Sequence, residues 1–248
     1  MQKQIMLHIV AGYPTLKKSE ELAYVLAKSG ADYIEIQIPF SDPVADGPTI
    51  MLANEESLKK GTRVKDCFLL MDNLSKKFRK EGLKTKLLFM TYFNIVFNFG
   101  VENFCRSAKK AGCWGLIIPD ITIDEEAHEQ YFYIAKKHRL KAVQIVSPLT
   151  PVARLKKIAK SADGLVYCVS KYGTTGQSGS LNPKLTEYLA RVKKQIKIPL
   201  AVGFGISEKK HLEAIWGKVE IAVVGSALMN AYIGGEIKAV EKFLKVLK

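Results

Sequence analysis

Short apolar runs alternate along the chain with longer stretches in which apolar residues recur every three or four positions. Eight runs rich in Ile, Val and Leu have the length of buried strands: Ile5–Val10, Tyr33–Ile38, Lys86–Met90, Gly115–Ile118, Lys141–Val146, Gly164–Cys168, Pro199–Val202 and Glu220–Val224. The expected helices are Ser19–Ser29, Lys65–Lys80, Val101–Ala111, Asp124–His138, Val152–Ser161, Pro183–Lys194, Glu208–Trp216 and Ile237–Leu247. This alternation predicts βαβ units and a parallel sheet.

Eight strands and eight helices predict a single (β/α)₈ TIM barrel. Residues 1–248 are expected to form one domain, because α/β barrels of about this length commonly do. The alternative is an open doubly wound sheet, which usually has a glycine-rich turn after its first strand. Here that turn is AGYPT, from Ala11 to Thr15, and it favours the barrel. The active site of a barrel lies at the C-terminal ends of its strands.

The second apolar run contains a carboxylate. Glu35 lies between Ile34 and Ile36, where a charge must be hydrogen-bonded, paired or neutralised because an isolated buried charge is too costly. It is either a core acid held by a hydrogen bond or a group that both donates and accepts a proton at the barrel mouth. Asp46 follows in the next loop, which gives two carboxylates in different environments. Such a pair can divide acid–base chemistry from charge stabilisation.

Glycines follow the seventh and eighth predicted strands. Gly203-Phe204-Gly205 and Gly225-Ser226 lie in the two loops where barrels frequently bind a phosphate through backbone N–H groups and a helix N-terminus. Each pair on its own is equally consistent with a tight turn. Their occurrence in both loops predicts a phosphate site.

The segment after the sixth strand, SKYGTTGQSGSLNP from Ser170 to Pro183, is long, small and polar. Its glycines, Gly173 among them, are possible hinges of a lid over the active site. The alternative is a plain connector. If the segment is a lid, Tyr167 and Thr175 face the substrate or the lid.

Charge and composition limit the kinds of partner that the chain is expected to bind. The chain has 38 Lys and Arg against 24 Asp and Glu, a formal net charge of +14, but the lysines lie mostly in helical segments without interleaved aromatic residues. We therefore expect a solvated basic surface, no nucleic-acid binding, and a preference for a phosphorylated small molecule or an acidic protein. Four cysteines and four histidines show no metal-ligand spacing, so we expect free buried thiols and no metal site. No signal peptide or membrane span is evident, and a cytoplasmic protein is expected.

Seven motifs, in order and spacing, resemble the α subunit of tryptophan synthase. They are AGYP at Ala11–Pro14, the block Glu35–Pro48, MTYFN at Met90–Asn94, PD at Pro119-Asp120, YCVSKYGTTG at Tyr167–Gly176, VGFGIS at Val202–Ser207 and VGSA at Val224–Ala227. The resemblance implies retro-aldol cleavage of indole-3-glycerol phosphate to indole and glyceraldehyde 3-phosphate, with no cofactor in this chain. It also implies a pyridoxal-phosphate-dependent β subunit as partner, which holds that cofactor and receives the indole, in an α-β-β-α heterotetramer.

The resemblance also implies roles for residues. Glu35 matches the family's catalytic glutamate, which protonates indole C3 and takes the proton of the glycerol hydroxyl, and Asp46 matches the aspartate that holds the indole N–H. Tyr167 matches an active-site tyrosine. The lid and phosphate positions are matched by Thr175, Gly173, Gly203, Phe204, Gly205, Gly225 and Ser226.

Three positions depart from the family pattern. Gln37 stands where the family usually has glycine, His8 where it often has an aromatic residue, and Lys171 where it often has arginine. Gln37 lies on the same strand face as Glu35 by the period of two, so it either orients Glu35 or occupies space meant for substrate.

Two other functions stay open from the residues alone. One is another phosphate-binding barrel enzyme, such as a sugar-phosphate isomerase or epimerase, although no matching His/Asp constellation is present. The other is a catalytically weak barrel kept as an allosteric subunit, which Gln37 keeps open.

Overall fold

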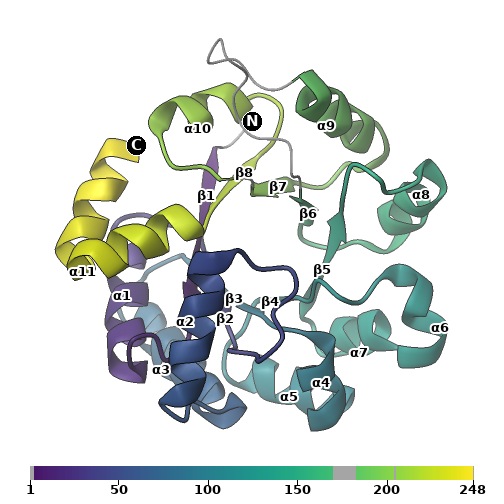
Figure 1. Cartoon of the computed structure of the whole chain (residues 1–248). Coiled ribbons are helices and arrows are strands. Elements are labelled where there is room, and N and C mark those ends of the chain that lie inside the picture. Colours follow the sequence, from purple (N-terminus) through teal and green to yellow (C-terminus); the bar gives the residue numbers. More distant parts are fainter. Residues whose placement is uncertain (1–2, 170–182, 204, 248) are drawn as a thin grey trace.

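The computed structural model describes residues 3–169, 183–203 and 205–247, and its strands form a closed barrel (Figure 1). The strands pair in parallel in sequence order, and β1 closes against β8. They are β1 (Gln4–Val10), β2 (Tyr33–Gln37), β3 (Lys86–Met90), β4 (Gly115–Ile117), β5 (Lys141–Val146), β6 (Val166–Val169), β7 (Leu200–Gly203) and β8 (Ile221–Val224). The predicted (β/α)₈ barrel is confirmed, and each strand lies within two residues of its predicted bounds.

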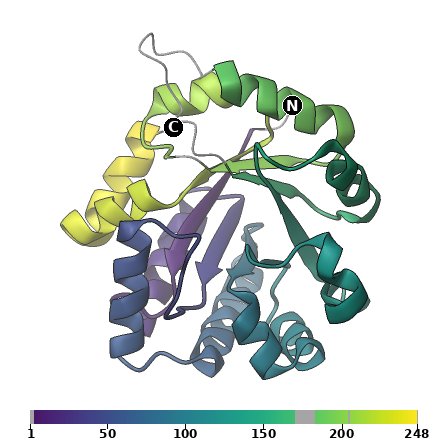
Figure 2. The same cartoon turned by 45° about the vertical axis from the view of Figure 1, so that its right-hand side comes forward.

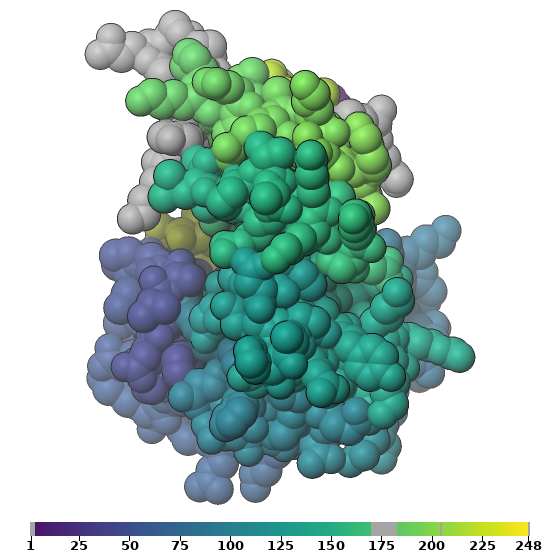
Figure 3. Space-filling view, turned by 90° about the vertical axis from the view of Figure 1, so that its right-hand side faces the viewer, coloured from purple at the N-terminus to yellow at the C-terminus, as the bar shows by residue number. Residues whose placement is uncertain are grey.

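Helices surround the barrel on the outside (Figures 1 and 2). They are α1 (Leu16–Lys28), α2 (Pro48–Lys59), α3 (Val64–Lys80), α4 (Phe93–Phe99), α5 (Val101–Lys110), η1 (Ile123–Glu125), α6 (Glu126–Glu129), α7 (Tyr131–Lys137), α8 (Val152–Ser161), α9 (Pro183–Gln195), α10 (Lys209–Ile215) and α11 (Ser226–Leu247). In the space-filling view of Figure 3, the teal and green segments on the side of α8 and α9 form a continuous outer surface.

The structure adds helices that the apolar pattern did not predict. The buried face of α2 carries Ile50, Ala53, Asn54 and Ser57, which gives no apolar stripe. In place of the long predicted helix at Asp124–His138 the structure has η1, α6 and α7, and α6 is separated from α7 by Gln130, which adopts a left-handed conformation with φ 51°.

The last helix begins earlier than predicted. Its first residue, Ser226, directly follows β8, and the helix is interrupted at Gly235 and Glu236 by non-helical backbone angles. Its first half runs beside α2, where the Thr49 hydroxyl donates to Asn230 Oδ1 over 3.0 Å (Figure 1). The N-terminus of α11 therefore lies at the C-terminal end of the strands.

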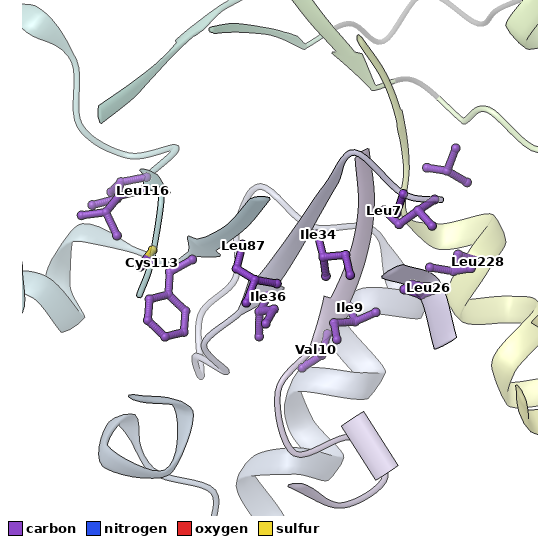
Figure 4. Close-up of a cluster of buried hydrophobic side chains, with 14 of the residues drawn as sticks. Leu7, Ile9, Val10, Leu26, Ile34, Ile36, Leu87, Cys113, Leu116 and Leu228 are labelled. Carbon is purple, nitrogen blue, oxygen red and sulfur yellow. The ribbon is translucent and has the colours of Figure 1, made fainter. Parts of the chain in front are cut away.

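Side chains alternate between two apolar layers. Outward-facing residues of β1 and β2, such as Ile9 and Ile36, pack between the strands and the helices, as Figure 4 shows. Inward-facing residues such as Met6, Leu88 and Val143 fill the barrel itself. The inward positions of β1 and β2 continue toward the strand ends, and the pairing register sets His8 beside Glu35.

The cysteines fit the sequence prediction of free buried thiols. Cys67, Cys105, Cys113 and Cys168 are all buried and unpaired. Burial raises the pKa of Cys105, Cys113 and Cys168 to about 12 in each case, so their thiols stay protonated at neutral pH. Among the described residues, no helix is both long and apolar enough to span a membrane.

Candidate active site

A cavity of about 730 Å³ opens at the C-terminal ends of the strands. Seven of the site residues that the sequence predicts line it: Glu35, Asp46, Tyr167, Gly203, Gly205, Gly225 and Ser226. Three further predicted site residues, Gly173, Thr175 and Phe204, lie outside the described residues, as does Lys171. Strands from the whole circumference of the barrel thus contribute to one cavity, and its volume suits a ligand of small-molecule size.

Glu35 lies in the middle of β2 and points into the barrel. Its side chain is almost fully buried, with 3% of the residue exposed. His8 Nδ1, on the adjacent strand, lies 3.1 Å from Glu35 Oε1. The other carboxylate oxygen, Oε2, has no hydrogen-bond partner among the described residues. Among the described residues, only one of the two carboxylate oxygens of Glu35 is therefore held by a hydrogen bond.

The charge state of His8 follows from this contact. Burial by itself lowers the pKa of His8, but the charge of Glu35 and its hydrogen bond outweigh burial, with smaller contributions from Asp46 and Gln37. The net result is a pKa raised above the ordinary 6.5 of histidine. The imidazolium form is therefore stabilised inside the cavity, next to two acidic side chains.

Asp46 is held by two donors. Gln37 Nε2 donates to Asp46 Oδ2 over 2.6 Å, and the hydroxyl of Tyr92 donates to the same oxygen over 3.2 Å. Burial raises the pKa of Asp46, while the hydrogen bonds of Gln37 and Tyr92 and the charge of His8 lower it. Burial is the largest effect, so the pKa of Asp46 lies above its ordinary value. Both donors bind the same oxygen, Oδ2, so these two hydrogen bonds from the described residues leave Oδ1 unused.

Gln37 therefore does something that neither sequence expectation described. It is fully buried, but its amide binds Asp46 and not Glu35. It is also not among the residues that line the cavity. Gln37 holds the loop carboxylate from inside the barrel.

Tyr92 is a site residue that the sequence analysis did not single out. It lies two residues after the end of β3, and its hydroxyl accepts a hydrogen bond from the backbone N–H of Ala45 over 3.0 Å as well as donating to Asp46. Its ring stacks on Phe40, with centroids 5.1 Å apart. The period of two, continued two residues past Met90, was the signal that places this side chain inside the barrel.

Tyr167 and Gly203 form a matched pair on neighbouring strands. The Tyr167 hydroxyl occupies the space beside Gly203, where an added Cβ would lie only 2.7 Å from it. Burial, followed by the charges of Glu35 and Asp46, raises the pKa of Tyr167 well above its ordinary value. Its hydroxyl therefore remains a protonated donor in the cavity.

Backbone groups form another part of the cavity wall, next to His8. Gly225 directly precedes Ser226, the first residue of α11. The N–H groups of the first helical turn therefore lie beside the cavity. Gly205 adopts φ +76°, a conformation that favours glycine. Helix N-termini attract anions through their unpaired N–H groups and dipole.

Other parts of the cavity wall are apolar. They are formed by Ile50, Met90, Ile117, Ile145 and Val223. The PD motif flanks them: Pro119 lines the cavity, and Asp120 accepts a hydrogen bond from the backbone N–H of Phe93 over 2.8 Å. Asp120 thus anchors the start of α4. The cavity therefore combines apolar walls, which suit a flat apolar group, with acidic side chains and with backbone N–H groups that can bind an anion.

Comparison with known proteins gives a consistent family. A family profile described as tryptophan synthase alpha chain matches residues 1–247. The tryptophan synthase alpha chain of Desulfotalea psychrophila is 41% identical over 244 residues, covering 98% of this chain and 93% of the relative. That of Methanocaldococcus jannaschii is 41% identical over 247 residues, covering 98% and 85%.

Solved structures agree in fold. A mutant tryptophan synthase alpha-subunit from Pyrococcus furiosus superposes with a TM-score of 0.87 at 30% identity, covering 100% of this chain and 99% of that one. Tryptophan synthase from M. tuberculosis in its aminoacrylate-bound form gives a TM-score of 0.86 at 30% identity, covering 99% and 92%. The likeness extends along the whole chain.

Proposed function

Since the chain belongs to the tryptophan synthase alpha chain family, we propose that its cavity binds indole-3-glycerol phosphate with the indole ring at the acidic end and the phosphate at the start of α11. The chain is a carbon–carbon lyase of tryptophan biosynthesis, which cleaves this substrate to indole and glyceraldehyde 3-phosphate. Family membership sets aside a sugar-phosphate isomerase or epimerase. The observation that supports the assignment of residues is the presence of Glu35 and Asp46 in one cavity with different hydrogen-bond partners.

Glu35 is proposed as the proton shuttle. Its free oxygen, Oε2, faces no competing partner among the described residues. A proton placed on indole C3 converts the ring into an indoleninium ion, which accepts the electron pair of the breaking carbon–carbon bond. The same carboxylate then takes the proton of the glycerol hydroxyl as the aldehyde forms, so that one group serves both proton transfers.

Asp46 is proposed to stabilise the charge on the ring. Its Oδ1 is the oxygen proposed to accept the indole N–H, since among the described residues Gln37 and Tyr92 both bind Oδ2. A carboxylate in this place offsets the positive charge that develops on the ring nitrogen when C3 is protonated. The apolar wall of Ile117 and Val223 suits the flat face of the ring. The ring itself is the electron sink, and we propose that the chain needs no cofactor for this step.

The experiment that tests the proposed function is direct. Indole release from indole-3-glycerol phosphate should be measurable with the isolated chain and rise when a β subunit is added. The alternative of a catalytically weak allosteric barrel predicts no release in either condition.

The phosphate site gives the first prediction. Ser226→Asp should weaken binding of glycerol phosphate by about 10- to 100-fold, because it places a negative charge against the phosphate at the helix N-terminus. Isothermal titration with glycerol phosphate measures this. Asn98→Asp, which adds the same charge on exposed α4, is the control and should bind normally. Equal affinity in the two variants would place the phosphate elsewhere.

The partner is proposed from the family. We infer that a β subunit docks on the rim that carries the cavity, in an α-β-β-α heterotetramer, and that pyridoxal phosphate belongs to that subunit. The loop between β2 and α2 supports the choice of this rim as the docking surface. It carries the site residue Asp46 and also Val44, which is an apolar residue that is 85% exposed. The closed barrel between β1 and β8 also supports the proposal that residues 1–248 form one domain.

Coupling to the partner gives the second prediction. Glycerol phosphate in this barrel should tighten β-subunit binding by about 5- to 150-fold, the usual range of coupling between two sites, and the β subunit should tighten glycerol phosphate binding by the same factor. Titrations with and without glycerol phosphate measure both effects. In Ser226→Asp the same ligand effect should need about 10- to 100-fold more glycerol phosphate, while the β-subunit affinity without ligand stays as it was. Identical affinities with and without glycerol phosphate in the unmodified chain would contradict the coupling.

A further inference from the structure

The contact between His8 and Glu35 is not explained by the roles given to the site so far. His8 is buried, with 6% of the residue exposed, and its Nδ1 binds Glu35 Oε1 over 3.1 Å. His8 also lines the cavity, and its Nε2 has no hydrogen-bond partner among the described residues. A buried polar ring with one partner needs a reason, because burying it costs free energy.

The surroundings of His8 are acidic on every side that carries a titratable group. Glu35 faces it from β2, together with the neutral amide of Gln37, and Asp46 faces it from the following loop. The neighbour after β8 is Gly225, which has no side chain. Among the described residues that line the cavity there is no Lys or Arg, and His8 is the one side chain there that can become a cation.

We propose that His8 and Glu35 act as a pair that shares one proton, in which His8 positions the carboxylate and holds the proton between turnovers. The inference rests on the proposed role of Glu35. It makes His8 a positioning residue that acts through Glu35.

The proton balance of such a pair is closed. In the free enzyme the proton lies on Nδ1, and its transfer to Oε1 leaves a neutral imidazole and a carboxylic acid. A half-turn of the Glu35 carboxyl group about its Cγ–Cδ bond brings that proton to the cavity, where it forms the new C–H bond at indole C3. The carbon–carbon bond then breaks and its electron pair restores the neutral ring. The glycerol O–H bond breaks to give the aldehyde, and Glu35 returns that proton to His8.

The pair explains how a proton is available at neutral pH. The pair holds one proton below the raised pKa of His8 and none above it, when imidazole and carboxylate are both deprotonated. An acid that is essential in the free enzyme appears as the falling limb of kcat/KM at high pH. That limb should therefore follow His8 in the unmodified chain.

The test separates the hydrogen bond of His8 from its proton. His8→Asn keeps an N–H near the place of Nδ1 but has no titratable proton, whereas His8→Phe removes both. We expect His8→Asn to shift the falling limb of kcat/KM to lower pH, because asparagine cannot hold the proton that His8 holds. At low pH it should lose less than about tenfold in rate. His8→Phe should lose about 10- to 100-fold there, because a hydrogen bond to a charged group is removed.

A second measurement does not depend on turnover. Imidazole nitrogen NMR of the protein, which has four histidines, should show His8 titrating above 6.5. In Glu35→Gln the charge is gone while the burial remains, so the pKa of His8 should fall below 6.5, and the other three histidines should not move. Unchanged pH limbs in His8→Asn, or an unchanged His8 titration in Glu35→Gln, would overturn the pair. An active Glu35→Gln would instead overturn the proposed function itself.

Discussion

Replacing Glu35 with Gln should abolish most indole production while leaving the barrel folded. A positioned acid or base contributes about 10²–10⁴-fold to a rate, and one carboxylate is proposed to serve two proton transfers, so the loss in kcat should reach the upper part of that range. Glutamine has the same size and keeps an oxygen that accepts a hydrogen bond from His8. The change removes the proton chemistry with little change in packing.

The measurement is single-turnover indole release together with the affinity for glycerol phosphate. Glu213→Gln, the same substitution at an exposed position on α10, is the matched control and should keep full activity. Affinity for glycerol phosphate should be retained in Glu35→Gln, because the proposed phosphate site is at the start of α11. Turnover within threefold of the unmodified chain would rule out Glu35 as the shuttle.

Much of the barrel could be predicted because buried strands leave a plain trace in the sequence. Parallel strands covered on both faces are continuous apolar runs, and the eight predicted runs became the eight strands. The same rule made Glu35 visible, since a charge inside such a run stands out. Helix α2 left no trace of this kind, because Ala53, Asn54 and Ser57 on its buried face are small or polar.

The hydrogen-bond partners within the site could not be predicted from the residues alone. The period of two sets the side of the strand on which His8, Glu35 and Gln37 lie, but it does not say which residues of different strands meet. That depends on the register between β1 and β2, which pairs His8 with Glu35, and on the path of the loop that returns Asp46 to the barrel. These contacts join residues distant in sequence, so the partner of Gln37 appears only in the folded chain.

The arrangement around Asp46 sets what an amide would do in its place. Gln37 and Tyr92 both donate to Oδ2, so an asparagine must turn its oxygen toward them to avoid placing two donors together. Its NH₂ group would then occupy the place of Oδ1 and face the cavity. The substrate would meet a donor where its indole N–H needs an acceptor.

Asp46→Asn should therefore lower kcat by about 10²–10³-fold, the usual effect of removing one preorganised electrostatic partner of a transition state. Glycerol phosphate should bind as before, since it carries no indole ring. Gln37→Met, which removes one of the two donors to Oδ2 but leaves the carboxylate and the Tyr92 hydroxyl, should cost less than Asp46→Asn. Steady-state indole release from both variants tests this order. A larger loss in Gln37→Met than in Asp46→Asn would mean that the buried amide, and not the charge of Asp46, supports the developing cation.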